Sequence, residues 1–242
     1  MERLGDEEKI LLTSYQLVGM FIARSSMAGA RVQSEAKTKL LDAAVGVIRA
    51  KGYSATTVDE ICQRAGVTKG GFFHHFESKE ALAVAAAEHF SSMAESLFSA
   101  APYRVLPDPV DRLLGYVDFR KAILQGELPE YTCLLGTMVQ EAYDTHPSIR
   151  LACEAGLLEH AQVLEADVSE ALRKYGVSPE WSAESLALYM QAVIQGAFVL
   201  AKATQCSEVA AACLDHLRRY LELLFNRPVN RSVNRFERKG AA

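Results

Sequence analysis

The strongest constraint on this chain is a series of three helical patterns between residues 38 and 82, each separated from the next by a glycine. The first has apolar residues at the i, i+1, i+4, i+7 and i+8 positions of an amphipathic helix and ends at Gly52. The second is short and ends at Gly66, and the third, also short, runs from Thr68 to about His75. Two short helices that are joined by a tight glycine turn and pack on a longer helix form a helix-turn-helix unit. The sequence therefore predicts such a unit.

Capping residues mark where these helices begin. Thr57 and Glu60 match the S/T-x-x-E capping box, in which each side chain accepts a hydrogen bond from the other residue's backbone. Ser78 is placed to cap a longer helix that continues past residue 90. Beyond Pro109 the helical period persists, and no stretch alternates as a strand does. The pattern predicts an all-α fold, with later helices over residues 109–125, 130–144, 146–175, 179–203 and 206–225.

The third short helix has a composition that stability alone does not explain. Gly70 and Gly71 stand inside it, and each glycine in a helix costs about 1 kcal/mol relative to alanine. Adjacent glycines suit a backbone that comes close to another surface, such as the floor of a DNA groove. The second short helix of a helix-turn-helix enters the major groove with its first residues at the base edges. Phe72 and Phe76, four residues apart, are expected to pack inward.

The run from Thr38 to Leu82 resembles the TetR (tetracycline-repressor) family of regulators. The matching residues are Ala43, Ala44, Gly52, Tyr53, Thr56, Thr57, Ile61, Ala65 to Gly70, Phe72, His75, Phe76 and Ser78 to Leu82. The stretch from Tyr131 to Arg150 is similar to a C-terminal domain found in a subset of these regulators. The resemblance implies an N-terminal three-helix DNA-binding domain followed by a helical bundle for ligand binding and dimerisation.

The resemblance also implies which residues contact DNA. It places one group at the base or phosphate face, namely Thr68, Lys69, Gly70, Gly71 and His74. It implies that Thr57 and Lys79 hold the flanking backbone. Phe73 faces outward where the family usually has a tyrosine that contacts phosphate through its hydroxyl, so it is expected to pack on sugar without that hydrogen bond. Outside this motif, Lys69 and Lys79 would be ordinary solvated lysines.

The charge distribution allows DNA binding without demanding it. The net charge is −4, but residues 35–90 carry as many basic as acidic side chains, and the acidity is concentrated in residues 91–225. A neutral module binds DNA if its few cations face phosphate. Five cysteines without regular spacing argue against a secreted disulfide framework and favour a reducing cytoplasm. No stretch is expected to span a membrane.

The sequence offers no catalytic or metal-binding pattern. It has no nucleophile with an adjacent base, and the run from Gly66 to Gly71 lacks the residue order of a P-loop. His74 and His75 are adjacent and point to different faces of a helix, which suits no shared metal ion. We therefore expect no enzymatic activity, no metal and no cofactor. The competing interpretation is a protein-interaction adaptor that keeps the helix-turn-helix as a scaffold.

The last two predicted helices are the expected dimer interface. Both are apolar over a broad face and rich in small residues, which suits close helix packing. Their apolar residues are Leu186, Tyr189, Met190, Val193, Ala197 and Leu200 on one, and Val209, Ala212, Cys213, Leu217, Tyr220, Leu221 and Leu224 on the other. The alternative is that these faces pack only within one chain. A homodimer is favoured because one recognition helix contacts few base pairs, and twofold symmetry doubles the site.

An effector site is expected among large side chains of the back half. The candidates, which could line an apolar pocket, are Phe90, Met93, Phe119, Cys133, Met138, Tyr143 and Trp181. The alternative is that these side chains are ordinary residues of the core. Cys133 is expected near a helix start, where the helix dipole favours the thiolate that senses electrophiles or oxidants. A buried, inert cysteine is the alternative.

These predictions divide the chain into four parts: a flexible arm over 1–34, a helix-turn-helix DNA-binding domain over 35–82, an effector-binding and dimerisation domain over 83–225, and a disordered basic tail over 226–242. The arm could also be an over-long start, with Met27 as the true initiator. The favoured function is a ligand-responsive transcriptional repressor. It would bind a palindromic double-stranded DNA operator as a homodimer and be released by a small-molecule effector or a thiol-reactive signal.

Overall fold

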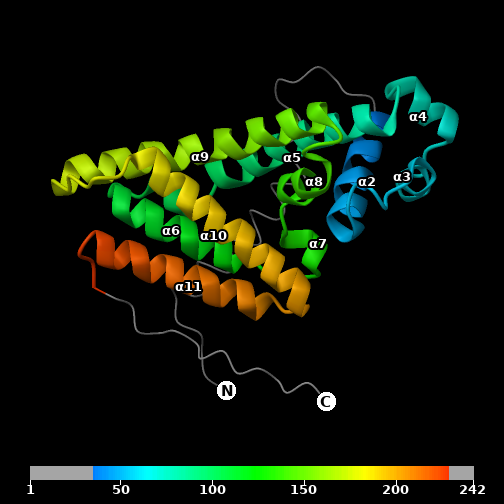
Figure 1. Cartoon of the computed structure of the whole chain (residues 1–242). Helices are drawn as coiled ribbons and strands as arrows, with labels where there is room; N and C mark the ends of the chain where they lie inside the picture. Colours follow the sequence, from blue (N-terminus) through cyan, green and yellow to red (C-terminus); the bar gives the residue numbers. More distant parts are fainter. Residues whose placement is uncertain (1–34, 229–242) are drawn as a thin grey trace, which may run out of the picture.

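The computed structural model describes residues 35–228, and every regular element in that range is helical (Figure 1). The first four elements are α2 (Glu35–Lys51), α3 (Val58–Ala65), α4 (Lys69–His75) and α5 (Lys79–Ser99). A 3₁₀ turn, η1 (Pro102–Val105), leads into α6 (Pro109–Ala122), α7 (Leu128–Tyr131), α8 (Leu134–Ala142), α9 (Pro147–Tyr175), α10 (Ala183–Thr204) and α11 (Ser207–Leu224). The molecule is elongated, with α2 to α4 at one end and α6, α10 and α11 toward the other. The predicted all-α fold class is confirmed.

Hydroxyl caps set the starts of the short helices, as the sequence predicts. The caps of α3, α4 and α5 each accept a backbone hydrogen bond: Thr57 from Glu60 (3.3 Å), Thr68 from Gly71 (3.1 Å) and Ser78 from Ala81 (3.0 Å). The capping box at α3 is only half formed, because the carboxylate of Glu60 pairs with Lys51. That part of the prediction is wrong, since a cation on the neighbouring helix draws the carboxylate away from the backbone of Thr57.

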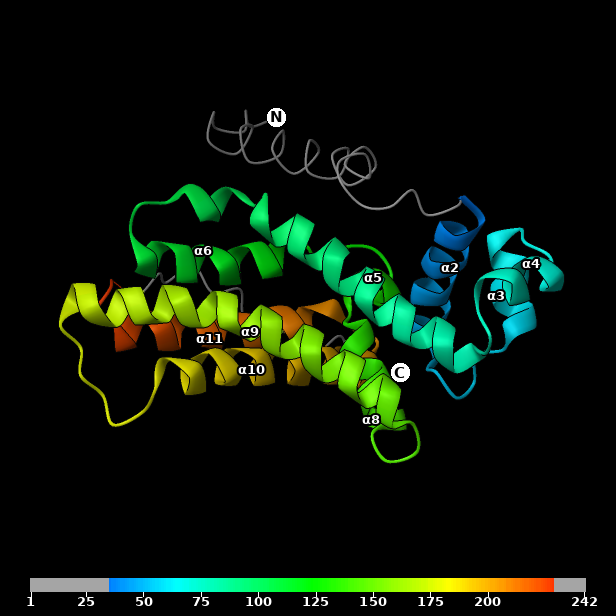
Figure 2. The same cartoon turned by 90° about the horizontal axis from the view of Figure 1, so that it is seen from above.

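Two large apolar cores and a third, small cluster between α10 and α11 hold the helices together. The far core lies among the end of α5, α6, α9, α10 and α11. The near core joins the helix-turn-helix to α8 and the first turns of α9, so that Met138 and Ile149 are buried in the same cluster as Phe72. Figure 2 shows α5 and α9 running from the helix-turn-helix end into the bundle. The predicted domain boundary after residue 82 therefore falls within one apolar core, to which residues on both sides of the boundary contribute.

The predicted helix over residues 130–144 is wrong in its continuity. The chain is extended at Thr132 and Cys133, which separates α7 from α8. Cys133 then caps α8, and its Sγ accepts a hydrogen bond from the backbone of Gly136 at 3.5 Å. The break frees the carbonyl of Thr132 from the helix, and Arg49 of α2 donates to that carbonyl at 2.6 Å. A long-range contact thus compensates for an interruption that the local sequence does not show.

The prediction of disorder from Asn226 onward is wrong for the first residues of the tail. The guanidinium of Arg227 pairs with Asp108 at 2.7 Å and donates to the hydroxyl of Tyr175 at 2.6 Å. These contacts fasten the chain after α11 to the ends of α6 and α9. The predictions for the arm over 1–34 and for residues 229–242 lie outside the described residues.

The expectation that no stretch could span a membrane does not hold for α10 on length and composition. This helix has a mean hydropathy of 1.4 over an 18-residue window. However, 44% of that window is buried inside the fold, as in the core helix of a globular bundle. Met190 and Ile194 of α10 are fully buried in the far core. Its hydropathy therefore reflects packing against α9 and α11.

Candidate DNA-binding and effector sites

The N-terminal half of α4 is exposed at the end of the molecule (Figure 1). Thr68, Lys69 and Gly70 are exposed there, and one turn later Phe73 (54% exposed) and His74 also face solvent. Phe72 and Phe76 are buried, as predicted, with ring centres 5.9 Å apart. The aromatic pair anchors α4 to the near core. The polar start of the helix therefore remains free to contact another molecule.

The two glycines of α4 differ in whether packing within the chain requires a glycine. A Cβ at Gly71 would lie 2.8 Å from a methyl group of Val67, which is too close for the present backbone. A Cβ at Gly70 would meet nothing nearer than the hydroxyl of Thr68 at 3.9 Å. Packing within the chain therefore explains Gly71. Gly70 has no such internal reason, and its bare backbone leaves the surface open to close approach.

Lys69 and Thr57 flank this surface. The ammonium of Lys69 lies 2.9 Å from the carboxylate of Asp59, and both side chains are largely exposed. The hydrogen bond and charge of Asp59 raise the pKa of Lys69, so this lysine is positively charged at neutral pH. Exposed ion pairs contribute little to stability, so Lys69 can exchange Asp59 for a phosphate at a small cost in free energy. The hydroxyl of Thr57 accepts its capping hydrogen bond and keeps its own proton for donation.

Lys79 points inward. Its ammonium donates to the backbone carbonyls of Tyr53 at 3.1 Å and Thr56 at 3.0 Å, and lies 4.2 Å from the centre of the Tyr53 ring. Burial lowers the pKa of Lys79. This lysine fastens the start of α5 to the turn between α2 and α3. Only one of its three N–H groups remains for DNA, so its predicted role at the DNA backbone stays a prediction.

A polar clamp, which the sequence analysis missed, joins the helix-turn-helix to the helices behind it. Glu141 of α8 accepts hydrogen bonds from the backbone N–H groups of Tyr53 at 3.2 Å and Ser54 at 2.9 Å. Arg49 donates to the carbonyl of Thr132, just before the start of α8, and burial lowers the pKa of Arg49 to about 10. These partners are more than 80 residues apart in sequence, so local patterns carry no sign of them.

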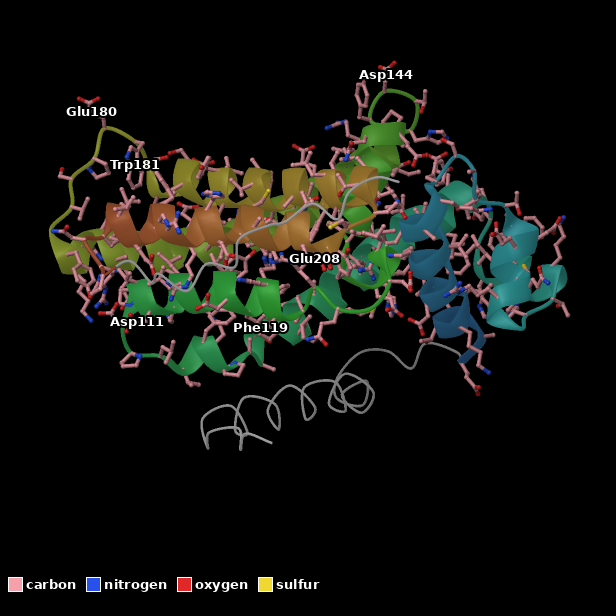
Figure 3. The ribbon with its side chains drawn as sticks, turned by 90° about the horizontal axis from the view of Figure 1, so that it is seen from below. Asp111, Phe119, Asp144, Glu180, Trp181 and Glu208 are labelled. Carbon is pink, nitrogen blue, oxygen red and sulfur yellow. The ribbon has the colours of Figure 1, made fainter. Side chains whose placement is uncertain are left out.

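The seven effector candidates do not line one site. Phe119 is buried in the far core and Met138 in the near core, whereas Met93 (40%) and Tyr143 (63%) are exposed. Figure 3 shows Trp181 toward the end of the molecule away from the helix-turn-helix and Phe119 about midway along the molecule. The other two, Phe90 and Cys133, are half-buried beside the near core. Their grouping into a single pocket stays a prediction that this arrangement does not favour.

A different group of polar side chains meets inside the bundle. The Arg120 cluster consists of Tyr116 and Arg120 of α6, His160 of α9 and Gln191 of α10. Arg120 donates through Nε to the Tyr116 hydroxyl at 3.0 Å, and its Nη2 lies 3.1 Å from Nε2 of His160. The Tyr116 hydroxyl is also 3.0 Å from that Nε2 and accepts a 3.4 Å bond from Gln191. The guanidinium lies 4.2 Å from the centre of the Phe98 ring.

The protonation of His160 follows from these contacts. Burial, and then the charge of Arg120, lower the pKa of His160 to about 3, so the imidazole is neutral at pH 7. Because a guanidinium only donates, Nε2 must accept and the proton is on Nδ1. Arg120 is spaced to continue the apolar stripe of Leu113 and Val117 along α6. An arginine on an apolar face is the one sequence feature that could have indicated this cluster.

Comparison with known proteins gives two adjoining matches. Residues 40–86 match the family model of bacterial regulatory proteins, tetR family. Residues 109–216 match the model of the LmrA/YxaF-like transcriptional regulator C-terminal domain. Together these segments cover the helix-turn-helix and most of the bundle.

Individual relatives agree with the family models. The transcriptional regulator AcuR of Cereibacter sphaeroides is 28% identical over 180 residues, which cover 74% of this chain and 82% of that protein. The uncharacterized HTH-type transcriptional regulator YerO of Bacillus subtilis is 38% identical over 95 residues, 36% of this chain. For YerO and two further relatives at 32–39% identity, the chain spans only 25–50% of their length. A TetR transcriptional regulator from Chloroflexus aurantiacus superposes with a TM-score of 0.68 at 26% identity, covering 77% of this chain and 94% of that one.

Proposed function

Because the chain belongs to the TetR family of bacterial regulatory proteins, we propose that it is a transcriptional repressor that binds operator DNA as a homodimer and releases it when an effector binds. The observation that carries this proposal is the exposed polar start of α4 at one end of the molecule. The role is regulatory and not enzymatic, and DNA binding places its action in the cytoplasm.

The proposed DNA contact begins at the N-terminus of α4. Lys69 exchanges Asp59 for a phosphate, and the backbone at Gly70 approaches the groove closely. His74 offers ring nitrogens to phosphate or a base edge, and Phe73 supplies an apolar face for sugar or a thymine methyl. Thr57 donates its hydroxyl proton to a flanking phosphate. These side chains contact DNA while Phe72 keeps the helix anchored behind them.

The proposed dimer interface is the exposed apolar face of α10 and α11. It consists of Leu188, Tyr189, Val199, Leu200, Tyr220 and Leu223, which are 39–64% exposed. The rings of Tyr189 and Tyr220 lie 5.3 Å apart across the two helices. Of the residues expected at the interface, Leu186, Met190, Ala197, Leu217 and Leu221 are instead buried within their own chain. The other side of the same helices therefore remains for a partner.

The primary test is fluorescence anisotropy with DNA from upstream of the protein's own gene, measured across a salt series. Binding is expected to survive unrelated competitor DNA and to weaken as salt rises. Lys69→Ala should reduce both affinity and salt slope, the slope by about 0.9 for each phosphate that the variant no longer neutralises. Arg173→Ala, which removes an exposed charge from the distant end of α9, is the matched control and should change neither. Binding no tighter than to random DNA, together with no preferred site in a genome-wide pull-down, would favour the adaptor interpretation.

The dimer is tested separately by analytical ultracentrifugation. Leu223→Asp places a charge on the proposed interface and should yield monomers that lose specific DNA binding. Leu151→Asp makes the same change at another exposed leucine, on α9 (54% exposed against 64% for Leu223), and should leave the dimer intact. A Leu223→Asp protein that sediments as the parent does would place the interface elsewhere.

A thiol-reactive signal at Cys133 is a second proposed route to release. This thiol caps α8 next to the hydrogen bond between Arg49 and the carbonyl of Thr132. An adduct there would disturb the contact between α8 and the helix-turn-helix. Thr137, also in α8, accepts a hydrogen bond from Lys202 of α10 at 2.7 Å. Iodoacetamide should release DNA from the parent and not from Cys133→Ser. Equal release from both proteins would rule this route out.

A further inference from the structure

The bundle holds an arginine that no carboxylate neutralises among residues 35–228. Arg120 has five N–H donors, and the protein uses two of them, one to Tyr116 and one to His160. Both acceptors are uncharged, since His160 is neutral at pH 7. Other cations of the bundle do have carboxylate partners: Arg112 pairs with Asp167, and Lys121 pairs with Asp215.

We propose that the Arg120 cluster binds the carboxylate of an aromatic or acyl acid, and that this acid is the effector. The unused N–H groups of the guanidinium suit a planar, bidentate anion. The Tyr116 hydroxyl accepts from both Arg120 and Gln191, so its proton is directed to His160 and the four groups form one oriented network. The guanidinium is held in place before the ligand arrives.

The surroundings of Arg120 determine the rest of the ligand. The rings of Phe98, Tyr103, Tyr116 and Phe119 form a continuous group with centres 5.6–5.9 Å apart. The imidazole of His160 lies 4.9 Å from Phe98. These aromatic neighbours favour a ligand with an apolar body and disfavour a second charge. A monocarboxylate with an aromatic ring or short acyl chain matches both features.

The position of the cluster connects this site to the DNA-binding end. Phe98 lies in the last turn of α5, whose first residue, Lys79, is fastened to the helix-turn-helix. His160 lies in the middle of α9, whose first turns carry Ile149 into the near core. A ligand at Arg120 would therefore lie beside α5 and α9, which both contribute residues to the near core. This assignment rests on the proposed function for its regulatory meaning, but binding itself does not depend on DNA.

The test is isothermal titration calorimetry of the full chain, without DNA, using phenylacetate and octanoate and their uncharged amides. At least one acid should bind, and its amide should bind roughly 10- to 100-fold more weakly, as expected when a charged hydrogen-bonded pair is removed. Arg120→Gln should weaken acid binding by the same factor. Arg173→Gln, an exposed arginine on α9, should bind as the parent does.

The variant Arg120→Lys guards against misfolding. It keeps the charge but lacks the planar fork, so it should bind the acid with intermediate affinity. Equal affinity for acid and amide, undiminished binding by Arg120→Gln, or no heat from either acid at millimolar concentration would overturn the assignment. Acid binding that fails to release operator DNA would refute the effector role and leave the carboxylate site standing.

Discussion

Replacing Lys79 with methionine separates a structural role from a DNA-contacting one. The family resemblance places this lysine at the DNA backbone, whereas the structure turns its ammonium toward the carbonyls of Tyr53 and Thr56. Methionine keeps most of the length and the apolar stem of the side chain. It removes the charge, both hydrogen bonds and the contact with the Tyr53 ring.

The expected loss of stability follows from these contacts. A hydrogen bond that involves a charged group contributes about 1.5–3 kcal/mol, and a partly exposed cation–π contact about 0.5–1 kcal/mol. Lys79 is only half-buried, so water can reach the freed carbonyls and the lower values apply. We expect Lys79→Met to lower the free energy of unfolding by about 3.5 kcal/mol. For a chain of this size that corresponds to a fall in Tm of roughly 7–14 °C.

The assay is thermal unfolding by far-UV circular dichroism, paired with the salt dependence of DNA binding. Lys69→Met is the matched control, because its side chain is exposed and pairs only with exposed Asp59. The control should melt as the parent does and show a shallower salt slope in DNA binding. A Lys79→Met protein that melts at the parent temperature but binds DNA with a shallower salt slope would refute the structural role.

Three further predictions concern Gly71, His160 and Arg49. Gly71→Ala should shift the start of α4 and lower the Tm, because its Cβ would meet Val67 at 2.8 Å, whereas Gly70→Ala should melt as the parent does and weaken operator binding in anisotropy by blocking close approach to the groove. The pKa of His160 is about 3 in the folded protein, below its value of about 6.5 in the unfolded chain. The free energy of unfolding therefore stays nearly constant above pH 6.5 and falls below pH 6.5, where the unfolded chain takes up a proton that the folded protein does not. The cost is about 2 kcal/mol at pH 5, and urea unfolding at pH 7 and pH 5 should show it in the parent and not in His160→Gln. Arg49→Met should strand the Thr132 carbonyl and speed amide hydrogen exchange in α8, while unchanged exchange would show that the clamp is dispensable.

Features set by neighbouring residues could be predicted from the sequence. The caps Thr57, Thr68 and Ser78 each bond a backbone N–H three residues away, so the motif itself contains both partners. The inward Phe72 and outward Phe73 follow from helical periodicity alone. The helix-turn-helix is therefore the part of the fold that the sequence describes best.

Features set by distant partners could not be predicted in this way. The break at Thr132 falls in an apolar run without glycine or proline, and it is stabilised by Arg49, 83 residues earlier. The direction of Lys79 depends on carbonyls 23 and 26 residues away. His160 is 40 residues from Arg120. The position of Arg120 on the apolar stripe of α6 is the only local sign of the pair, and it does not point to His160. Size and aromaticity, by which the effector candidates are grouped, do not by themselves distinguish a site from a core.

The same long-range contacts explain how a small change in the bundle can reach the DNA-binding end. A flexible linker would absorb a displacement, but α5 and α9 carry residues of both cores and so leave no hinge between them. Between these helices α8 is fixed on two sides, to the helix-turn-helix through Glu141 and to α10 through Lys202 and Thr137. Packed interfaces of this kind shift between discrete arrangements and do not deform gradually. An effector that favours one arrangement of α5 and α9 must therefore also select a position for α4, and in a dimer that position sets the distance between the two recognition helices.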